Sequence, residues 1–328
     1  MEFEAKFPVF MLKFKKPVEY MYRFGKKYSK LLKVLGDISV IIGVLGMIIA
    51  GALLTKGTFD IINGGPAQVG LVIPGVRIPG SPVYIPLVEG LVAILLLAIF
   101  HEGMHGIMAA AHGIKSKYTA LILMLFIPAA GVEVDEEKLR KKDTMTKLRI
   151  FAAGSMGNFI LAGLVFLLII PTGWIVGANS QFKGLKVLNS SNIAFKSDEV
   201  IQSVNGIDTR SIDRLQAALV EIGPNANVSV QTNQRVVTGR LDAKGKLGVY
   251  IEPLFNFTSI WGSIFAFIGK ILAISFSLNI GVGLINLLPL GILDGGRMFE
   301  TMNKRFYPAV STVALFLILM NIFGPIVF

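Results

Sequence analysis

The sequence predicts an α-helical polytopic membrane protein with about five spans, a re-entrant hairpin and one inserted α/β domain. Of its 328 residues, 53% are hydrophobic and 16% are charged, and the mean hydropathy is +0.66. A soluble domain carries about 25% charged residues, so this chain lacks the polar surface that a soluble globule needs. Cysteine is absent, which excludes a disulfide scaffold, thiolate metal sites and a cysteine nucleophile.

Five apolar segments are long enough to cross a bilayer, which takes about 20 helical residues. They are residues 35–54, 87–111, 150–170, 263–288 and 308–328. The fourth contains Lys270, Asn279 and Asn286, and polar side chains at such depth usually face the protein interior or a cavity. A sixth apolar run, residues 121–131, is too short to span and contains Pro128. We therefore expect it to be re-entrant or to form a hairpin lodged in the protein.

Positive charge alternates between the loops. Residues 1–34 hold nine Lys and Arg, residues 113–149 hold eight and residues 296–307 hold three, whereas residues 55–86 hold two. By the positive-inside rule, this predicts a multi-pass protein of the cell membrane with a cytoplasmic N terminus and with residues 177–258 outside. The Lys, Phe and Tyr near the N terminus suit an anionic leaflet. The lipid bilayer thus accounts for the net charge of +11, and nucleic acid is not expected as a partner.

The peptide His101-Glu102-Gly103-Met104-His105 lies in the second span. Residues four apart lie one helical turn apart, so the two imidazoles converge, and imidazole is a good zinc ligand. Glu102 is placed to take a proton from water that zinc has made acidic. Two His and a Glu within lipid are costly unless something compensates, and a metal ion is the simplest compensation. We therefore predict two zinc ligands, His101 and His105, and a general base, Glu102.

A catalytic zinc site usually has three protein ligands, so one more is needed. His112 lies seven residues beyond His105, about 10 Å along the helix, and cannot share the ion while the helix continues. Asp294 lies at the cytoplasmic end of the fourth span, after Pro289, and so approaches the depth of the two histidines. It is the predicted third ligand. The alternative is an aspartate in a turn or at a helix N-cap.

Together these residues resemble the site-2 protease family of intramembrane zinc metalloproteases. Besides H-E-x-x-H, the pattern N-x-x-P-x-x-x-x-D-G occurs from Asn286 to Gly295. The segment Ala153–Phe159 resembles the family's small-residue helix ending in Asn-Phe, and residues 126–133 resemble its re-entrant hairpin. The joint pattern is far more specific than any single motif. One departure is the Ser that follows Gly154, where Pro is more usual.

The resemblance implies hydrolysis of peptide bonds in or near the transmembrane segment of a single-span substrate, after an upstream site-1-type protease has trimmed it. It implies that Asn286 holds the substrate backbone, although such an amide can also bridge spans. We also assign Asn158 to substrate binding; alternatively, it bridges two helices that pack closely at Gly154 and Gly157. The zinc ligands and general base that the resemblance implies are those named above: His101, His105, Asp294 and Glu102.

An intramembrane protease must also hold its substrate extended, because a helix hides its peptide bonds. An exposed edge strand does this through main-chain hydrogen bonds that tolerate many sequences. The run of residues 121–134 is a candidate for that strand, and a plain loop packed on the protein is an equal alternative.

The composition changes over residues 178–256, where strands and one helix are expected. The predicted strands are residues 185–188, 199–204, 228–232, 234–241 and 247–251. Ser211 is the predicted cap of a helix over residues 211–221, and Asn205-Gly206 the predicted turn after a strand. This pattern resembles PDZ domains, which bind peptides between a strand and a helix. Lys183-Gly184-Leu185 is a candidate for the peptide-binding loop, and a filter against bulky substrates is as well supported as docking.

The predicted organisation has four parts. A basic cytoplasmic segment (1–34) precedes three spans with the hairpin (35–176), an extracytoplasmic PDZ-like domain (177–258) and two further spans (259–328). Two other function classes stay open. One is a non-catalytic membrane scaffold or chaperone of the same fold, against which the intact Glu102 argues. The other is a transporter, suggested by Asp294 in a broken helix but without a visible repeat of the first half in the second.

Overall fold

The computed structural model describes residues 2–6, 8–65, 69–70, 72–76, 78, 83–125, 127–191, 193–196, 198–209, 211–291 and 293–327. Phe126 of the predicted hairpin, Ile292 of the N-x-x-P-x-x-x-x-D-G pattern and Phe328 of the predicted fifth span lie outside these ranges. The chain divides into two compact units. Unit 1 comprises Met1–Ile170 and Phe267–Phe328, and unit 2 comprises Pro171–Ala266.

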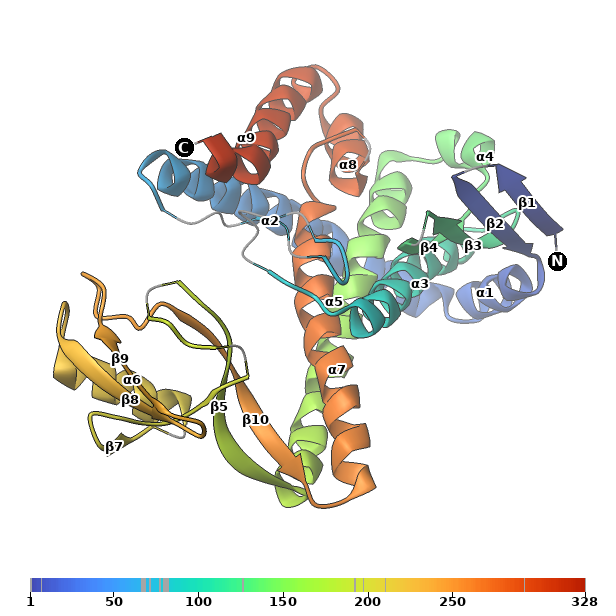
Figure 1. The fold of residues 1–328 in the computed structure, drawn as a ribbon. Helices are drawn as coiled ribbons and strands as arrows, with labels where there is room; N and C mark the ends of the chain where they lie inside the picture. The colour runs from blue at the N-terminus through green and yellow to red at the C-terminus, as the bar shows by residue number, and fades with distance from the viewer. Residues whose placement is uncertain are drawn as a thin grey trace. The chain divides into compact units, whose positions relative to one another are not determined.

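Within the described residues, five helices are long and apolar enough to cross a membrane (Figure 1). They are α2 (Ser29–Ile62), α3 (Leu87–Ala111), α5 (Thr144–Ala178), α7 (Ile260–Ile285) and α9 (Tyr307–Val327). This finding confirms the prediction of a polytopic helical protein. Helices α2 and α5 have 34 and 35 residues, so both extend beyond the about 20 residues that a bilayer requires.

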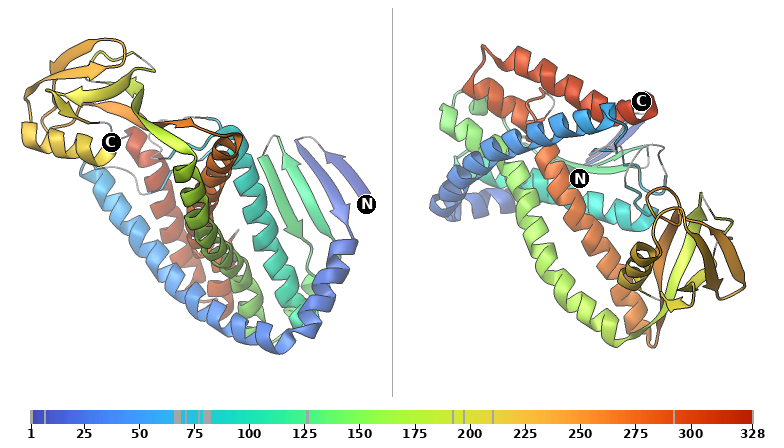
Figure 2. Two further views of the ribbon diagram at one scale, coloured as in Figure 1. Left: turned by 90° about the horizontal axis from the view of Figure 1, so that it is seen from below. Right: turned by 90° about the vertical axis from the view of Figure 1, so that its left-hand side faces the viewer.

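A four-stranded antiparallel sheet lies beside α3 in unit 1 (Figure 2). Its order is β1 (Glu2–Lys6), β2 (Val9–Phe14), β3 (Thr119–Met124) and β4 (Ile127–Val132). Strands β3 and β4 form a hairpin at the predicted place; whether it re-enters a membrane stays a prediction. Strands β1 and β2 were missed, because the N-terminal charges were interpreted as a basic surface segment. The alternation Glu2-Phe3-Glu4-Ala5-Lys6 has the period of a strand and was the available signal.

Three short helices complete the connections in unit 1. They are α1 (Lys16–Lys27), α4 (Glu136–Arg140) and α8 (Asp294–Met302). Helix α1 follows β2 directly, packs against α3 and leads into α2. Helix α4 begins at Asp135, whose side chain accepts a hydrogen bond from the Lys138 N–H as an N-cap.

Helices α3 and α5 approach closely because α5 carries glycine where they meet. A Cβ atom at Gly157 would lie 2.6 Å from Cγ of Met104 and 2.9 Å from the carbonyl oxygen of Phe100. Such distances are too short for a side chain, so only glycine allows this approach. Buried Ile150 and Ala153 of α5 continue the same contact. Small residues at helix contacts are the usual means of close packing in membrane proteins.

Unit 2 contains an antiparallel sheet of order β10-β5-β6-β8-β9, with β7 paired to β6. The strands are β5 (Ser180–Ser190), β6 (Val200–Val204), β7 (Ile207–Asp208), β8 (Asn227–Thr232), β9 (Val236–Arg240) and β10 (Val249–Phe257). Helix α6 (Ile212–Ile222) starts at the predicted cap, where the Ser211 side chain accepts a hydrogen bond from the Arg214 N–H. An α/β domain is therefore present. Its PDZ-like identity stays a prediction.

The proposed peptide-binding loop of this domain is not a loop. Lys183-Gly184-Leu185 lies inside strand β5, where Gly184 and Leu185 pair with Leu254 and Pro253 of β10. That part of the sequence interpretation is wrong, because the glycine marks a distorted strand position, with a φ of 136°, rather than a turn.

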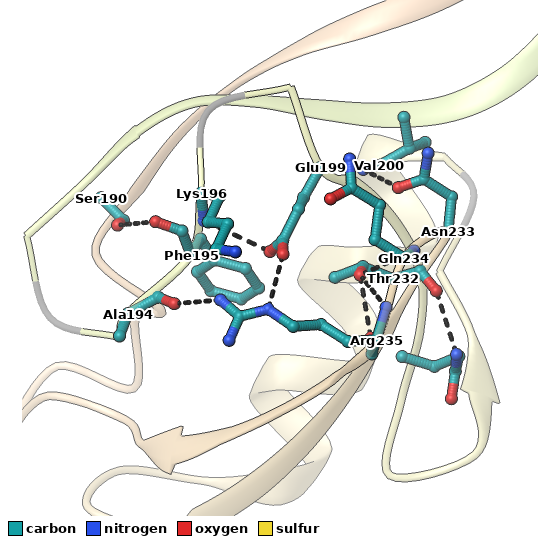
Figure 3. A network of polar contacts seen from close by, with 11 residues as sticks. Ser190, Ala194, Phe195, Lys196, Glu199, Val200, Thr232, Asn233, Gln234 and Arg235 are labelled. Atoms are coloured by element: carbon teal, nitrogen blue, oxygen red, sulfur yellow. Dashed lines mark hydrogen bonds and ion pairs between the residues drawn. The ribbon is translucent and has the colours of Figure 1, made fainter.

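An ion pair between a buried carboxylate and a partly exposed arginine connects two loops of unit 2 (Figure 3). The Glu199 carboxylate is fully buried and accepts a hydrogen bond of 2.7 Å from Nε of Arg235. Arg235 also donates through Nη2 to the Ala194 carbonyl at 2.7 Å, and the Lys196 N–H donates to Glu199 at 3.3 Å. A buried carboxylate without partners would be strongly destabilising. The pair therefore holds the segment before β6 against the turn between β8 and β9.

Candidate metal centre

The side chains of His101, His105 and Asp294 converge on one point in unit 1. Oδ2 of Asp294 lies 3.1 Å from Nε2 of each histidine, and the two Nε2 atoms lie 3.3 Å apart. The three side chains are only 11–14% exposed. Three ligands in a tetrahedron at about 2.0–2.1 Å from zinc lie about 3.3 Å from one another. The spacing of these three atoms therefore fits a single metal ion of that size.

Helix α3 presents the two histidines, and α5 contacts the far side of both rings. Nδ1 of His105 lies 2.7 Å from the carbonyl oxygen of Ile150, and Nδ1 of His101 lies 3.1 Å from Nδ2 of Asn158. The contact of His101 is buried and that of His105 is partly buried, and both leave the Nε2 atoms facing Asp294. Asn158 was predicted to contact substrate; its described contact is with His101, and the substrate contact stays a prediction.

The position of Asp294 results from a tight chain reversal after α7. Helix α7 ends at Ile285, and the Gly295 N–H donates to the Asn286 carbonyl at 2.7 Å. A Cβ atom at Gly295 would lie 2.6 Å from the Leu288 carbonyl oxygen, and one at Gly296 would overlap the Leu290 carbonyl. The two glycines thus let α8 start directly against the reversed chain. Asp294 stands in the first turn of α8, and its carboxylate faces the histidines.

Glu102 lies beside this group, next to a cavity of about 270 Å³. The Val132 N–H of β4 donates to its carboxylate at 3.0 Å. The cavity is lined by Glu102 with His101, Asp294, Asn286 and Ala130. Asn286 therefore faces the space next to the three converging side chains, where sequence analysis expected the substrate backbone.

A second cavity of about 460 Å³ reaches the same group. Glu102, His105 and Asp294 line it together with Glu136 and Arg297. Arg297 Nη2 lies 3.4 Å from Glu136 Oε1, and both side chains are about half exposed. Such an exposed ion pair contributes little to stability, so it can open without a large penalty. The converging side chains thus have polar access besides the first cavity.

The third histidine lies outside the group, as predicted. His112 is the C-cap residue of α3, and its Nδ1 lies 3.3 Å from Oγ1 of Thr146. Burial of the ring, together with the nearby charge of Arg149, lowers the pKa of His112 to about 4. His112 is therefore neutral at physiological pH.

The part that α5 plays in the site was not predicted from the sequence. A Cβ atom at Gly154 would lie 2.6 Å from Nε2 of His101 and closer still to Nε2 of His105. The glycine was interpreted only as a helix-packing residue. The four-residue spacing of Ile150, Gly154 and Asn158 places all three on one face of a helix, and this was the available signal.

Comparison of the chain with known protein families gives a match over most of its length. A model of peptidase family M50 matches residues 89–322. The chain belongs to peptidase family M50, the site-2 protease family. The resemblance in the sequence motifs is thereby confirmed.

Two curated relatives show how far the similarity extends. An uncharacterized protein of Methanocaldococcus jannaschii is 26% identical over 217 residues, which are 64% of this chain and 56% of that protein. A membrane-bound transcription factor site-2 protease homolog of Arabidopsis thaliana is 25% identical over 200 residues, which are 58% of this chain and 38% of that protein. The chain thus spans less than two thirds of the length of either relative.

Proposed function

We propose that this M50 protein is a zinc-dependent intramembrane endopeptidase. It would hydrolyse peptide bonds in or near the transmembrane segments of single-span substrates, after an upstream site-1-type protease has trimmed them. The observation that carries the proposal is the convergence of two imidazole nitrogens and one carboxylate oxygen beside a cavity that Glu102 also lines. Two nitrogens and one oxygen with an open fourth position form the donor set of catalytic zinc in peptidases. Zinc bound there supplies a Lewis acid that makes water acidic near neutral pH.

The chain's own residues account for the movement of protons. Glu102 accepts a proton from the attacking water, whose oxygen bonds to the carbonyl carbon of the substrate. The same carboxyl group then gives this proton to the amide nitrogen as the C–N bond breaks. The water is thus divided between a new carboxyl group and a new amine. The Val132 N–H fixes the Glu102 carboxylate, and Asn286, which lines the same cavity, would hold the substrate backbone.

Strand β4 is a suitable template for an extended substrate. It lies at an edge of its sheet, and successive residues of a strand direct their main-chain groups to opposite sides. The Glu133 N–H bonds to Tyr118 on the β3 side, whereas the Val132 N–H bonds to Glu102. The N–H and C=O of Ala130 therefore point to the same side as those of Val132. Since Ala130 also lines the first cavity, a substrate strand pairing there would pass Glu102.

This model of substrate binding predicts the effect of Ala130→Pro. Proline removes one N–H from the free edge and leaves the β3 ladder intact, because the Ala130 N–H points away from β3. Loss of one hydrogen bond, at about 0.5–1.5 kcal/mol, lowers kcat/KM about 2- to 12-fold. The kcat/KM of each variant is measured from cleavage of a single-span peptide in detergent. Ala130→Ser keeps the N–H and is the matched control; equal kcat/KM for the two variants would contradict edge-strand binding.

Charge and sheet topology support the proposed membrane orientation and the proposed role of unit 2. The alternation of basic loops supports a cytoplasmic N terminus and an extracytoplasmic unit 2. Within unit 2, β10 is an edge strand that follows Gly245 and Gly248, both with positive φ. A strand edge after such a loop can accept a peptide end, so unit 2 would dock trimmed substrates or exclude untrimmed ones. The second cavity, with its exposed Glu136 and Arg297, would admit water.

Metal removal tests the proposed activity. A panel of single-span peptides in detergent is expected to be cleaved by the purified protein, to resist cleavage after chelation and to be cleaved again once about one equivalent of Zn²⁺ is restored. Unchanged cleavage by metal-free protein would contradict the proposal. Absence of cleavage from zinc-loaded protein across the panel would favour the scaffold. Solute flux into liposomes that is changed neither by a chelator nor by the substitution Glu102→Gln would favour the transporter.

A further inference from the structure

One face of α5 contacts both histidines of the proposed metal centre. Ile150, Gly154 and Asn158 lie four residues apart and so share that face. The Ile150 carbonyl meets Nδ1 of His105, the Asn158 amide meets Nδ1 of His101, and Gly154 leaves the space between them. The two residues that contact the rings, Ile150 and Asn158, lie eight residues apart on α5. The two histidines that they contact lie four residues apart on α3.

The contact of His105 fixes which nitrogen carries its proton. A carbonyl oxygen only accepts hydrogen bonds, so at 2.7 Å from the Ile150 oxygen, Nδ1 of His105 must be the protonated nitrogen. Nε2 then keeps its lone pair, and this is the atom that faces Asp294. A neutral imidazole in this tautomer is ready to bind a metal ion through Nε2.

At His101, the group that faces Nδ1 is a side-chain amide and not a main-chain carbonyl. Nδ2 of Asn158 lies 3.1 Å from Nδ1 of His101, while its Oδ1 is buried and has no hydrogen-bond partner among the described residues. The two ends of an amide interchange when it turns by 180°, and the choice is made from the hydrogen bonds. Metal binding through Nε2 requires a proton on Nδ1. Only the amide oxygen can accept that proton's hydrogen bond.

We infer that Asn158 is a positioning residue that accepts a hydrogen bond from Nδ1 of His101 and thereby holds Nε2 toward the metal. This inference rests on the proposed zinc centre. Asn158 is fully buried and does not line either cavity described above, which disfavours direct contact with substrate. Helix α5 is then the element that orients both histidine ligands, through a main-chain carbonyl for one and a side-chain amide for the other.

Zinc affinity in a matched set of variants tests the inference. Asn158→Leu has a similar volume without an acceptor, whereas Asn158→Asp keeps one; aspartate is a common partner of zinc-bound histidine. We expect Asn158→Leu to bind Zn²⁺ about 10- to 100-fold more weakly than wild type, and Asn158→Asp to stay within a few-fold. Competition with a chromophoric chelator in detergent measures the affinity. The thermal midpoint of the metal-free protein is recorded in parallel.

Asn321→Leu is the control, because Asn321 is equally buried but bonds to the Leu54 carbonyl and to Thr58 of α2, in unit 1 away from both histidines. It should leave zinc affinity unchanged. Equal zinc affinity in wild type and Asn158→Leu would overturn the inference. So would an equal loss in the Leu and Asp variants accompanied by a lower metal-free midpoint, since that identifies a merely structural bridge. A wild-type protein that binds no zinc would instead defeat the proposed function first.

Nitrogen-15 NMR gives a readout that needs no variant. The chain has three histidines, so its imidazole signals can be assigned. In zinc-loaded protein, Nδ1 of both His101 and His105 should carry a proton and Nε2 should not. An unprotonated Nδ1 on His101 would overturn the role of Asn158 while leaving the zinc centre intact.

Discussion

Glu102→Gln is expected to abolish cleavage while the metal stays bound. The substitution keeps the size of the side chain and the three converging side chains of the proposed metal centre, His101, His105 and Asp294. Glutamine cannot accept the proton of the attacking water. General acid–base catalysis contributes about 10²–10⁴-fold to rates, so kcat should fall by at least that factor. Zinc content and cleavage rate are measured on the same preparation, which separates loss of the base from loss of the metal.

Glu89→Gln is the matched control for this prediction. Glu89 lies on the same helix, 13 residues before Glu102 and in the first turn of α3. The same chemical change there should leave both zinc content and cleavage unaffected. Wild-type cleavage by Glu102→Gln would remove Glu102 from the mechanism. Loss of zinc from this variant would mean instead that Glu102 holds the metal.

Gly154→Ala is expected to weaken metal binding and to lower activity. The added Cβ would lie 2.6 Å from Nε2 of His101 and closer to Nε2 of His105, so the imidazoles must move away from Asp294. Overpacking of this kind costs about 1–3 kcal/mol. Taken from the metal site alone, this is about 5- to 150-fold in zinc affinity. Zinc titration of the purified variant measures the change.

Gly163→Ala provides the comparison on the same helix. A Cβ atom at Gly163 meets nothing within 4 Å, so this variant should bind zinc and cleave substrate as wild type does. Wild-type zinc affinity in Gly154→Ala would show that the histidines are not confined by α5. Equal losses in both variants would point to a general effect on the helix and would contradict the role of this one glycine.

The centre of the site could be predicted because helix geometry converts sequence spacing into distance. His101 and His105 are four residues apart on a helix, and their Nε2 atoms lie 3.3 Å apart. Asp294 could be expected near the histidines because the predicted orientation of the spans brings the end of the fourth span to their depth and a third ligand was needed. The histidine pair needed only the local helical spacing, whereas Asp294 needed the predicted topology of the spans and the ligand count of a zinc site.

The supporting residues could not be predicted in the same way, because they depend on how helices approach one another. The contact of Asn158 with His101 exists only since glycines let α5 lie close to α3. The Val132 N–H reaches Glu102 only because β4 lies beside α3. Strand β2, which carries β1 as its hairpin partner, pairs with β3 across more than a hundred residues, and local pattern does not encode that pairing.

In unit 2 as well, the features with a local sequence signature were predicted, and the feature that depends on long-range pairing was not. The cap at Ser211 and the turn at Asn205-Gly206, both with local signatures, lie where they were predicted. The glycine of Lys183-Gly184-Leu185 was misinterpreted as a loop, because its partner strand β10 lies about seventy residues further along the chain. A glycine in a strand and a glycine in a loop look alike until the pairing is known.

Metal analysis of the purified protein tests the central claim most directly, namely that three side chains from two chain segments hold one catalytic zinc ion. Wild-type protein, dialysed against buffer with trace Zn²⁺, is compared with Asp294→Asn by mass spectrometry of its metal content. The account predicts about one zinc per chain in wild type and far less than one in Asp294→Asn, because loss of a ligand weakens binding by more than the about 10- to 100-fold that a supporting residue costs. Wild-type protein without zinc, or Asp294→Asn with full zinc, would contradict it.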